Sequence, residues 1–246
     1  MRSLERALQV FEGLQRSEGA QRLSDIATAH GMSSATVLRI LRVLKDYGLV
    51  SQTSAGYRVG AATLPPAQQY LQGDPLPVHG IPILDELART TRLTASLFTR
   101  SGHERILVAR SDGVHPLRYT LPFGVRLPLT LGAAGKVLLF GSPEEELAAV
   151  LEASVKIGHE PAGTTVADLV ARLGDQGRGY ASSSDERATG VISVAVCVPR
   201  RQGAPTESVS LTSPAERLRL HELEADVHEL KRAALLLGER LEGQLY

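Results

Sequence analysis

The order of helical and extended segments in the first sixty residues constrains this chain more than any other feature. Apolar residues recur at the spacing of one helix face after Ser3, a suitable N-cap, and they predict a first helix. The expected inner face of that helix is Leu4, Ala7, Leu8, Phe11 and Leu14. Two more helices are expected over residues 25–30 and 34–47, separated by a glycine, followed by a hairpin over 49–52 and 57–59.

This order is typical of a winged helix-turn-helix, in which the second helix of the pair enters the major groove of DNA. Ser33 caps the expected helix 34–47, and the small or hydroxyl-bearing side chains on its first turns can approach base edges. Arg39 can reach a guanine or a phosphate, and the later basic residues are suited to phosphates. The residues expected to contact DNA are Ser33, Ser34, Ala35, Thr36, Leu38, Arg39, Arg42, Lys45 and Arg58. The alternative is a small helical subdomain with a solvated basic face.

Charge is divided unevenly along the chain. The 246 residues carry 27 basic and 27 acidic side chains, so the formal net charge is zero. Residues 1–62 hold eight basic and five acidic side chains, a net charge of +3, and residues 63–246 therefore carry −3. A small basic module joined to an acidic one indicates two kinds of partner, although an imbalance of this size also occurs on ordinary surfaces.

Composition excludes several classes of protein. Hydrophobic residues make up 43% and charged residues 22%, which excludes a disordered chain, and no apolar run is long enough to predict a transmembrane helix. The first residues lack the apolar stretch of a signal peptide. Cys197 is the single cysteine, which excludes an intrachain disulfide and a cysteine-rich zinc site, so we expect a cytoplasmic protein.

Motifs in both halves of the chain resemble those of the IclR family of bacterial transcription regulators. They lie at residues 4–8, 23–27, 36–41, 48–50 and 56–60 in the first half, and at 127–129, 133–136, 179–181, 185–186, 190–191 and 193–195 in the second. The resemblance implies a DNA-binding head and a C-terminal effector domain similar to GAF and PAS domains. It also implies a homodimer or a dimer of dimers.

The chain departs from the family pattern at two places. Prolines at 65, 66, 75 and 77 interrupt the region where family members usually run a helix from the wing into the second domain. Cys197 stands where the family usually has a proline, and its role is left open. We therefore expect a winged helix-turn-helix domain over 1–62, a linker over 63–80 with one short helix, and an effector-binding and oligomerisation domain over 81–246.

The second domain is expected to mix helices with a largely antiparallel sheet, so the two-domain chain is of the α+β class. Strands are expected at 94–99, 105–109, 117–121, 180–184, 191–198 and 207–212, and helices at about 81–91, 133–140, after 142, 165–177 and after 213. Capping boxes are expected at Ser142–Glu145 and Ser213–Glu216, and Thr165 with Asp168 is expected to start a helix.

The resemblance also implies an effector pocket. Its residues would be Ala133, Ala134, Asp185, Ser193, Ser208 and Ser210. Backbone amides at the start of a helix and serine hydroxyls suit a small carboxylate. Three alternatives stay open: close packing of the 132–135 segment, a solvated loop at 185–186, and strand serines with no ligand. A nucleotide loop is excluded, because Thr130 and Val137 stand where that motif needs glycine and a hydroxyl.

The last helix carries an apolar stripe with alternating spacings of four and three. Its members are Leu223, Val227, Leu230, Ala234, Leu237 and Leu241. The stripe either packs on the domain's own sheet or forms a dimer contact. His221 and His228 are explained by a solvated face, so no metal site is predicted.

Together these features predict a sequence-specific DNA-binding regulator whose operator affinity is changed by a small effector, a carboxylic acid by the chemistry of the expected pocket. The alternative is a DNA-binding dimer with no ligand, either architectural or constitutive. No nucleophile triad, metal cluster or nucleotide loop supports an enzyme, so neither catalysis nor a cofactor is expected. The expected partners are a pseudo-palindromic operator, the effector and a second copy of the chain, with no membrane.

Overall fold

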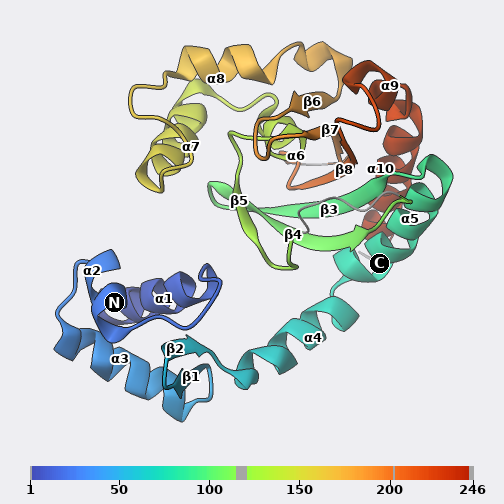
Figure 1. Cartoon of the computed structure of the whole chain (residues 1–246). Helices are drawn as coiled ribbons and strands as arrows, with labels where there is room; N and C mark the ends of the chain where they lie inside the picture. The colour runs from blue at the N-terminus through green and yellow to red at the C-terminus, as the bar shows by residue number, and fades with distance from the viewer. Residues whose placement is uncertain (1, 115–120, 202, 244–246) are drawn as a thin grey trace. The chain divides into compact units, whose positions relative to one another are not determined.

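The computed structural model describes residues 2–114, 121–201 and 203–243. The chain divides into two compact units, Met1–Gly73 and Asp74–Tyr246 (Figure 1). Both units combine helices with antiparallel strands, which confirms the expected α+β architecture with an N-terminal winged helix-turn-helix. Among the described residues, no helix is long and apolar enough to cross a membrane.

The N-terminal unit has the expected order of elements. Its elements are α1 (Arg2–Gln15), α2 (Leu23–Ala29), α3 (Ser34–Asp46), β1 (Val50–Thr53), β2 (Gly56–Val59), a 3-10 turn (Ala61–Thr63) and α4 (Leu64–Gly73). Strands β1 and β2 pair antiparallel as the wing. The core of this unit is built from Val10, Leu14, Ile26, Ala27, Val37, Leu41, Val50 and Tyr57.

The inner face expected for the first helix is only partly right. Helix α1 already includes Ser3, so that residue is not an N-cap. Leu4 is 65% exposed and Leu8 54%, whereas Val10 and Leu14 are buried. The helix therefore contributes to the core with its C-terminal half, and periodicity alone could not show where along the helix the contacts begin.

The region expected as a linker, residues 63–80, contains more helix than the single short helix expected there. Helix α4 ends at Gly73 and α5 (Pro75–Thr91) begins two residues later, so the region is helical. Proline is tolerated in a first turn, where its missing N–H has no intrahelical partner. Pro75 stands at that position of α5, and the Asp74 side chain accepts a hydrogen bond from the Leu76 N–H at 2.9 Å.

The C-terminal unit is built on a six-stranded antiparallel sheet. Its strands are β3 (Thr94–Ser101), β4 (Glu104–Ser111), β5 (Arg126–Pro128), β6 (Ala181–Ser184), β7 (Val191–Cys197) and β8 (Glu207–Pro214). They lie in the order β5-β4-β3-β8-β7-β6. The strand expected at 117–121 falls mainly outside the described residues.

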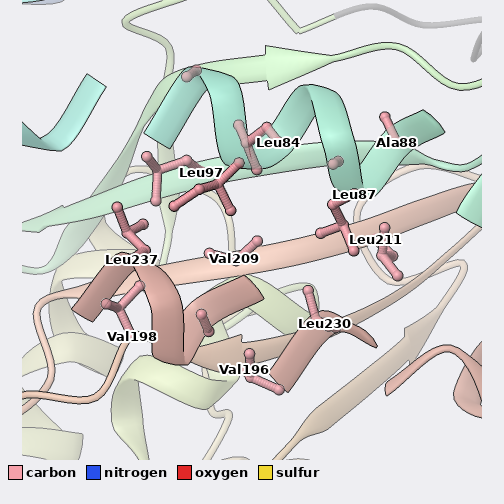
Figure 2. Close-up of a cluster of buried hydrophobic side chains, with 14 of the residues drawn as sticks. Leu84, Leu87, Ala88, Leu97, Val196, Val198, Val209, Leu211, Leu230 and Leu237 are labelled. Atoms are coloured by element: carbon pink, nitrogen blue, oxygen red, sulfur yellow. The ribbon is translucent and has the colours of Figure 1, made fainter. Parts of the chain in front are cut away.

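Helices cover both faces of this sheet. On one face lie α5, α9 (Leu220–Ala225) and α10 (Val227–Glu242) (Figure 1). On the other lie α6 (Ala133–Lys136) with a 3-10 turn (Val137–Leu139), α7 (Glu144–Lys156) and α8 (Val166–Leu173), and a further 3-10 turn (Gln176–Arg178) precedes β6. Figure 2 shows leucines of α5 and α10 meeting Leu97, Val209 and Leu211 of the sheet.

The apolar stripe of the last helix belongs to this core. All six stripe residues, from Leu223 to Leu241, are buried within the unit itself. The stripe therefore packs on its own sheet, and its interpretation as a dimer contact is wrong. Among the described residues, no group of three or more His, Cys, Asp or Glu side chains is arranged to hold a metal ion.

Neither of the two expected capping boxes is formed. The helix start expected at Thr165 is confirmed, and there Thr165 and Asp168 make a reciprocal capping box at α8. Helix α7 begins one residue later than expected, with Pro143 as its N-cap. Strand β8 continues through Pro214, so the last helical region begins only at Leu220. Pairing with β7 carries the strand past the sequence signal for a helix start.

Candidate DNA-binding and effector sites

The start of α3 presents the residues expected to read DNA. The Ser33 hydroxyl caps the helix by accepting a hydrogen bond from the Thr36 N–H at 3.3 Å, and the two hydroxyl oxygens lie 2.9 Å apart. Ser34 and Ala35 are exposed beside them. Ser33 is thus committed to holding the helix end, while the neighbouring small side chains leave that end accessible.

The basic residues of this surface differ in their surroundings. Arg39 and Arg42 are exposed on α3, and within the described part of the chain they have no hydrogen bond or ion pair. Lys45 donates to Gln52 on the wing at 3.2 Å, and Arg58 donates to Ser51 at 3.4 Å. Two cations are therefore free to meet a ligand and two are oriented by the wing.

Leu38 does not share this exposure. It is half-buried and packs against the core of the N-terminal unit. Its side chain supports the helix, so contact with DNA would involve only its exposed part.

The wing is fixed to the start of α2 by backbone pairing. Gln21 and Tyr57 exchange two hydrogen bonds of 2.8 Å. Gly56 adopts a φ of 135°, and a Cβ on it would collide with the Gln21 carbonyl. The glycine that the sequence places before Tyr57 is therefore required by a close approach between two backbones.

A small cavity of about 50 Å³ lies in the C-terminal unit where the effector site was expected. Four of the six expected residues line it: Ala133, Ala134, Ser193 and Ser210. The Ser193 hydroxyl is within 2.7 Å of the Ser183 hydroxyl. Ser210 lies on β8 and faces the cavity from the sheet.

The other two expected residues are engaged elsewhere. Ser208 is fully buried and donates to the Ala134 carbonyl at 3.0 Å, so it holds α6 against the sheet. Asp185 is exposed, has a φ of 57° and accepts a hydrogen bond from the Gly190 N–H at 2.6 Å. That bond lowers the pKa of the Asp185 carboxyl, and the residue shapes the loop before β7.

Glu186, the next residue, reaches the start of α6. One carboxylate oxygen lies 2.5 Å from Nζ of Lys136, which is itself buried, and the other accepts a hydrogen bond from the Gly132 N–H at 2.9 Å. The Glu186 carboxylate therefore occupies the Gly132 amide, which lies next to the amides expected to bind the carboxylate of an effector.

Three arginines that were not expected also line the cavity: Arg105, Arg110 and Arg187. No aspartate or glutamate is among its described lining residues. Arg110 forms an ion pair of 2.8 Å with Asp112 and donates to the Leu121 carbonyl at 2.9 Å. The described lining is therefore cationic, and Asp112 is the counter-ion of one of its three arginines.

Arg105 is the most deeply placed of the three. It is 2% exposed, its Nη1 donates to the Pro128 carbonyl, and its guanidinium lies over the Phe98 ring at 5.3 Å. Burial, together with the nearby charge of Arg187, lowers the pKa of Arg105 to about 9, while Glu186 acts in the opposite direction.

The sequence contained a signal for Arg105. In the expected strand 105–109 it lies two residues before Leu107, so the two side chains share a face of the strand, and Leu107 is buried. A charged residue on the inner face of a strand is uncommon and points to a site.

Cys197 packs against the same core cluster as α6 and the turn that follows it. Its thiol donates to the Val137 carbonyl at 3.1 Å. Burial and the charge of Glu207 raise its pKa to about 12, so the thiolate needed for reaction is disfavoured.

Comparisons with known proteins agree on both units. The model of the IclR helix-turn-helix domain matches residues 3–54, and that of the bacterial transcriptional regulator IclR C-terminal domain matches 68–237. The HTH-type transcriptional repressor AllR of Klebsiella pneumoniae is 30% identical over 223 residues, covering 88% of this chain and 81% of that protein.

Solved structures share the fold. An IclR transcriptional regulator of Alicyclobacillus acidocaldarius has a TM-score of 0.81 at 24% identity, covering 98% of this chain and 99% of that one. An IclR homologue of Microbacterium hydrocarbonoxydans, solved with 4-hydroxybenzoate, has a TM-score of 0.72 at 20% identity, with coverage of 98% and 99%.

Proposed function

The chain belongs to the IclR family of bacterial transcriptional regulators. We propose that it binds an operator through α3, and that a small carboxylate in the C-terminal cavity raises or lowers its affinity for that operator. The observation that carries the effector half is the cavity itself, which three arginines and no described acidic residue line. A cationic cavity of this kind suits an anionic ligand.

On the DNA, the start of α3 reads base edges in the major groove. Ser34, Ala35 and Thr36 are small enough to approach the bases, and Arg39 reaches a guanine or a phosphate. Arg42, Lys45 and the wing residue Arg58 contact phosphates, which position the head without reading sequence.

A net charge of +3 on one head is small, so we infer that two heads act together. A homodimer, or a dimer of dimers, places two α3 helices in successive major grooves of a pseudo-palindromic operator. A protein that acts on the chromosome works in the cytoplasm of a bacterium, and no catalytic step is needed for this role.

The effector changes operator affinity only by binding one arrangement of the heads better than another. Such couplings are typically about 1–3 kcal/mol, or about 5- to 150-fold in affinity. A DNA-binding dimer without a ligand is the second candidate, and it leaves the cationic cavity unexplained.

The test begins with operator selection from random DNA by the full-length chain, followed by binding measurements at several salt concentrations. Arg39→Ala should weaken binding and relax sequence preference. Arg42→Ala should weaken all sequences alike and lower the salt slope by about one, because one phosphate is no longer neutralised.

Arg89→Ala is the control, because Arg89 is an exposed arginine of α5 in the other unit, paired with Glu86 at 2.6 Å. It should leave DNA binding unchanged. If Arg39→Ala and Arg42→Ala bind the selected operator as the unaltered chain does, with the same salt slope, α3 is not the reading helix.

A further inference from the structure

The guanidinium of Arg105 is hydrogen-bonded at one nitrogen and, within the described part of the chain, has no partner at the other two. Its Nη1 donates to the Pro128 carbonyl. Its Nε is buried and has no hydrogen-bond partner, and Nη2 has none either, among the residues that the structure describes. Buried polar groups are nearly always paired, so an unmet donor on a residue that lines a cavity points to a partner held in that cavity.

The surrounding charges do not neutralise Arg105. Glu186 attracts the guanidinium, but its two carboxylate oxygens are bonded to Lys136 and to the Gly132 N–H. Arg187 adds a second positive charge nearby. A buried cation without a bonded counter-ion is unfavourable, so the arrangement gains from an anion supplied by a ligand.

The segment before α6 is shaped around this side chain. A Cβ on Gly135 would collide with Nη1 of Arg105 and lie 2.5 Å from the Leu129 carbonyl oxygen. A Cβ on Gly132 would lie 3.2 Å from Nη2. Gly132 and Gly135 therefore make room for the guanidinium.

The two unpaired nitrogens of Arg105, Nε and Nη2, define the ligand's chemistry. Nε and Nη2 of an arginine present two parallel donors, which a carboxylate accepts with its two oxygens. The guanidinium lies over the Phe98 ring on one face, which leaves its edge for the ligand. The cavity of about 50 Å³ favours a small ligand, and Ser193 and Ser210 line it.

We propose that Arg105 is the carboxylate-binding residue of this protein's effector site, gripping a small carboxylate through Nε and Nη2. The assignment rests on the proposed function and deepens it, because it names the group that selects an anionic effector. It differs from the sequence expectation, which gave that role to backbone amides at the start of α6.

The test measures ligand binding to the full chain by calorimetry. The probes are acetate, malonate and succinate, each paired with its uncharged amide, and inorganic phosphate as a tetrahedral anion. At least one carboxylate should bind, its amide should not, and phosphate should bind more weakly. Arg105→Met should lower the affinity for the carboxylate by about 10- to 100-fold, because methionine cannot form the charge-assisted bidentate hydrogen bonds.

Two further variants separate the contact from general damage. Arg105→Lys keeps the charge without the paired donors, and it should bind more weakly than the unaltered chain. Arg100→Met is the matched control, because Arg100 is a poorly exposed arginine on the neighbouring strand β3, paired with Glu146 at 2.5 Å and outside the cavity lining. It should bind the carboxylate normally.

The proposal is overturned if Arg105→Met binds the carboxylate as the unaltered chain does, if the amides bind as well as the acids, or if phosphate binds more tightly. It is overturned too if no carboxylate binds. The affinity for the operator is then measured with and without uncharged metabolites, which tests the effector part of the proposed function separately. If one of them changes operator affinity, ligand regulation stands without Arg105; if no metabolite does, the effector half of the proposed function also fails.

Discussion

Replacing Arg105 by methionine should stabilise the ligand-free protein. Methionine has a similar unbranched stem and removes a buried positive charge that has no bonded counter-ion among the described residues. Substitutions at binding sites often have this effect, because a site arranged for a ligand is strained without it.

The size of the effect follows from the pKa. A pKa of about 9, well below the ordinary value of an arginine, corresponds to a penalty of up to about 5 kcal/mol on the charged form, at about 1.4 kcal/mol for each pKa unit. Losing the hydrogen bond to the Pro128 carbonyl offsets about 1.5–3 kcal/mol. We therefore expect a net gain of about 2–3 kcal/mol and a rise in Tm of roughly 4–10 °C.

The gain should not depend on pH near neutrality. The folded-state pKa lies below the unfolded one, so the unfolded chain binds more protons only above about pH 9, and stability rises with pH only there. Below that pH Arg105 is protonated in both states, and the penalty is fully present. Scanning calorimetry at about pH 6 and about pH 8 should give the same difference in Tm.

Arg100→Met provides the control for this prediction. It removes an arginine that has a carboxylate partner, so it should lower Tm. A fall in Tm for Arg105→Met as large as that for Arg100→Met would show that the Arg105 charge is compensated in the folded protein. The guanidinium would then need no anion from a ligand.

Three more predictions concern single positions. Gly135→Ala should lower Tm by several degrees in calorimetry, because its Cβ meets backbone as well as Arg105, whereas Gly19→Ala, with open space around it, should change Tm little. Cys197 should react slowly with a thiol reagent at about pH 8 in the folded protein and quickly in urea, since burial raises its pKa to about 12; equal rates in both conditions would contradict its burial. Ser33→Ala should cost about 1 kcal/mol in urea unfolding of the head and weaken operator binding, and an unchanged midpoint would mean that the cap contributes nothing.

The N-terminal unit was predictable because its signals are local. The Ser33 cap and the glycine turns are each decided within a few residues, and the structure has them where the sequence indicated. The exposure of Leu4 and Leu8 was not predictable, because it depends on where the rest of the unit ends along α1.

The effector site was predictable only in outline. The family resemblance led to the cavity lined by Ala133 and Ser210, but it also included Asp185 and Ser208, which bond to the protein's own backbone. Arg105 was missed because its significance lies in what it does not contact. A sequence shows which residue is charged, and only a structure shows that its charge is unpaired.

Glu186 has a consequence for selectivity. Because it is part of the chain, its carboxylate competes for the Gly132 amide at the effective concentration of a tethered group, in the millimolar range or above. A free carboxylate at a lower concentration does not displace it by mass action alone. Glu186 therefore disfavours metabolites that must bind the Gly132 amide. Metabolites that bind other hydrogen-bond donors of the cavity do not compete with Glu186.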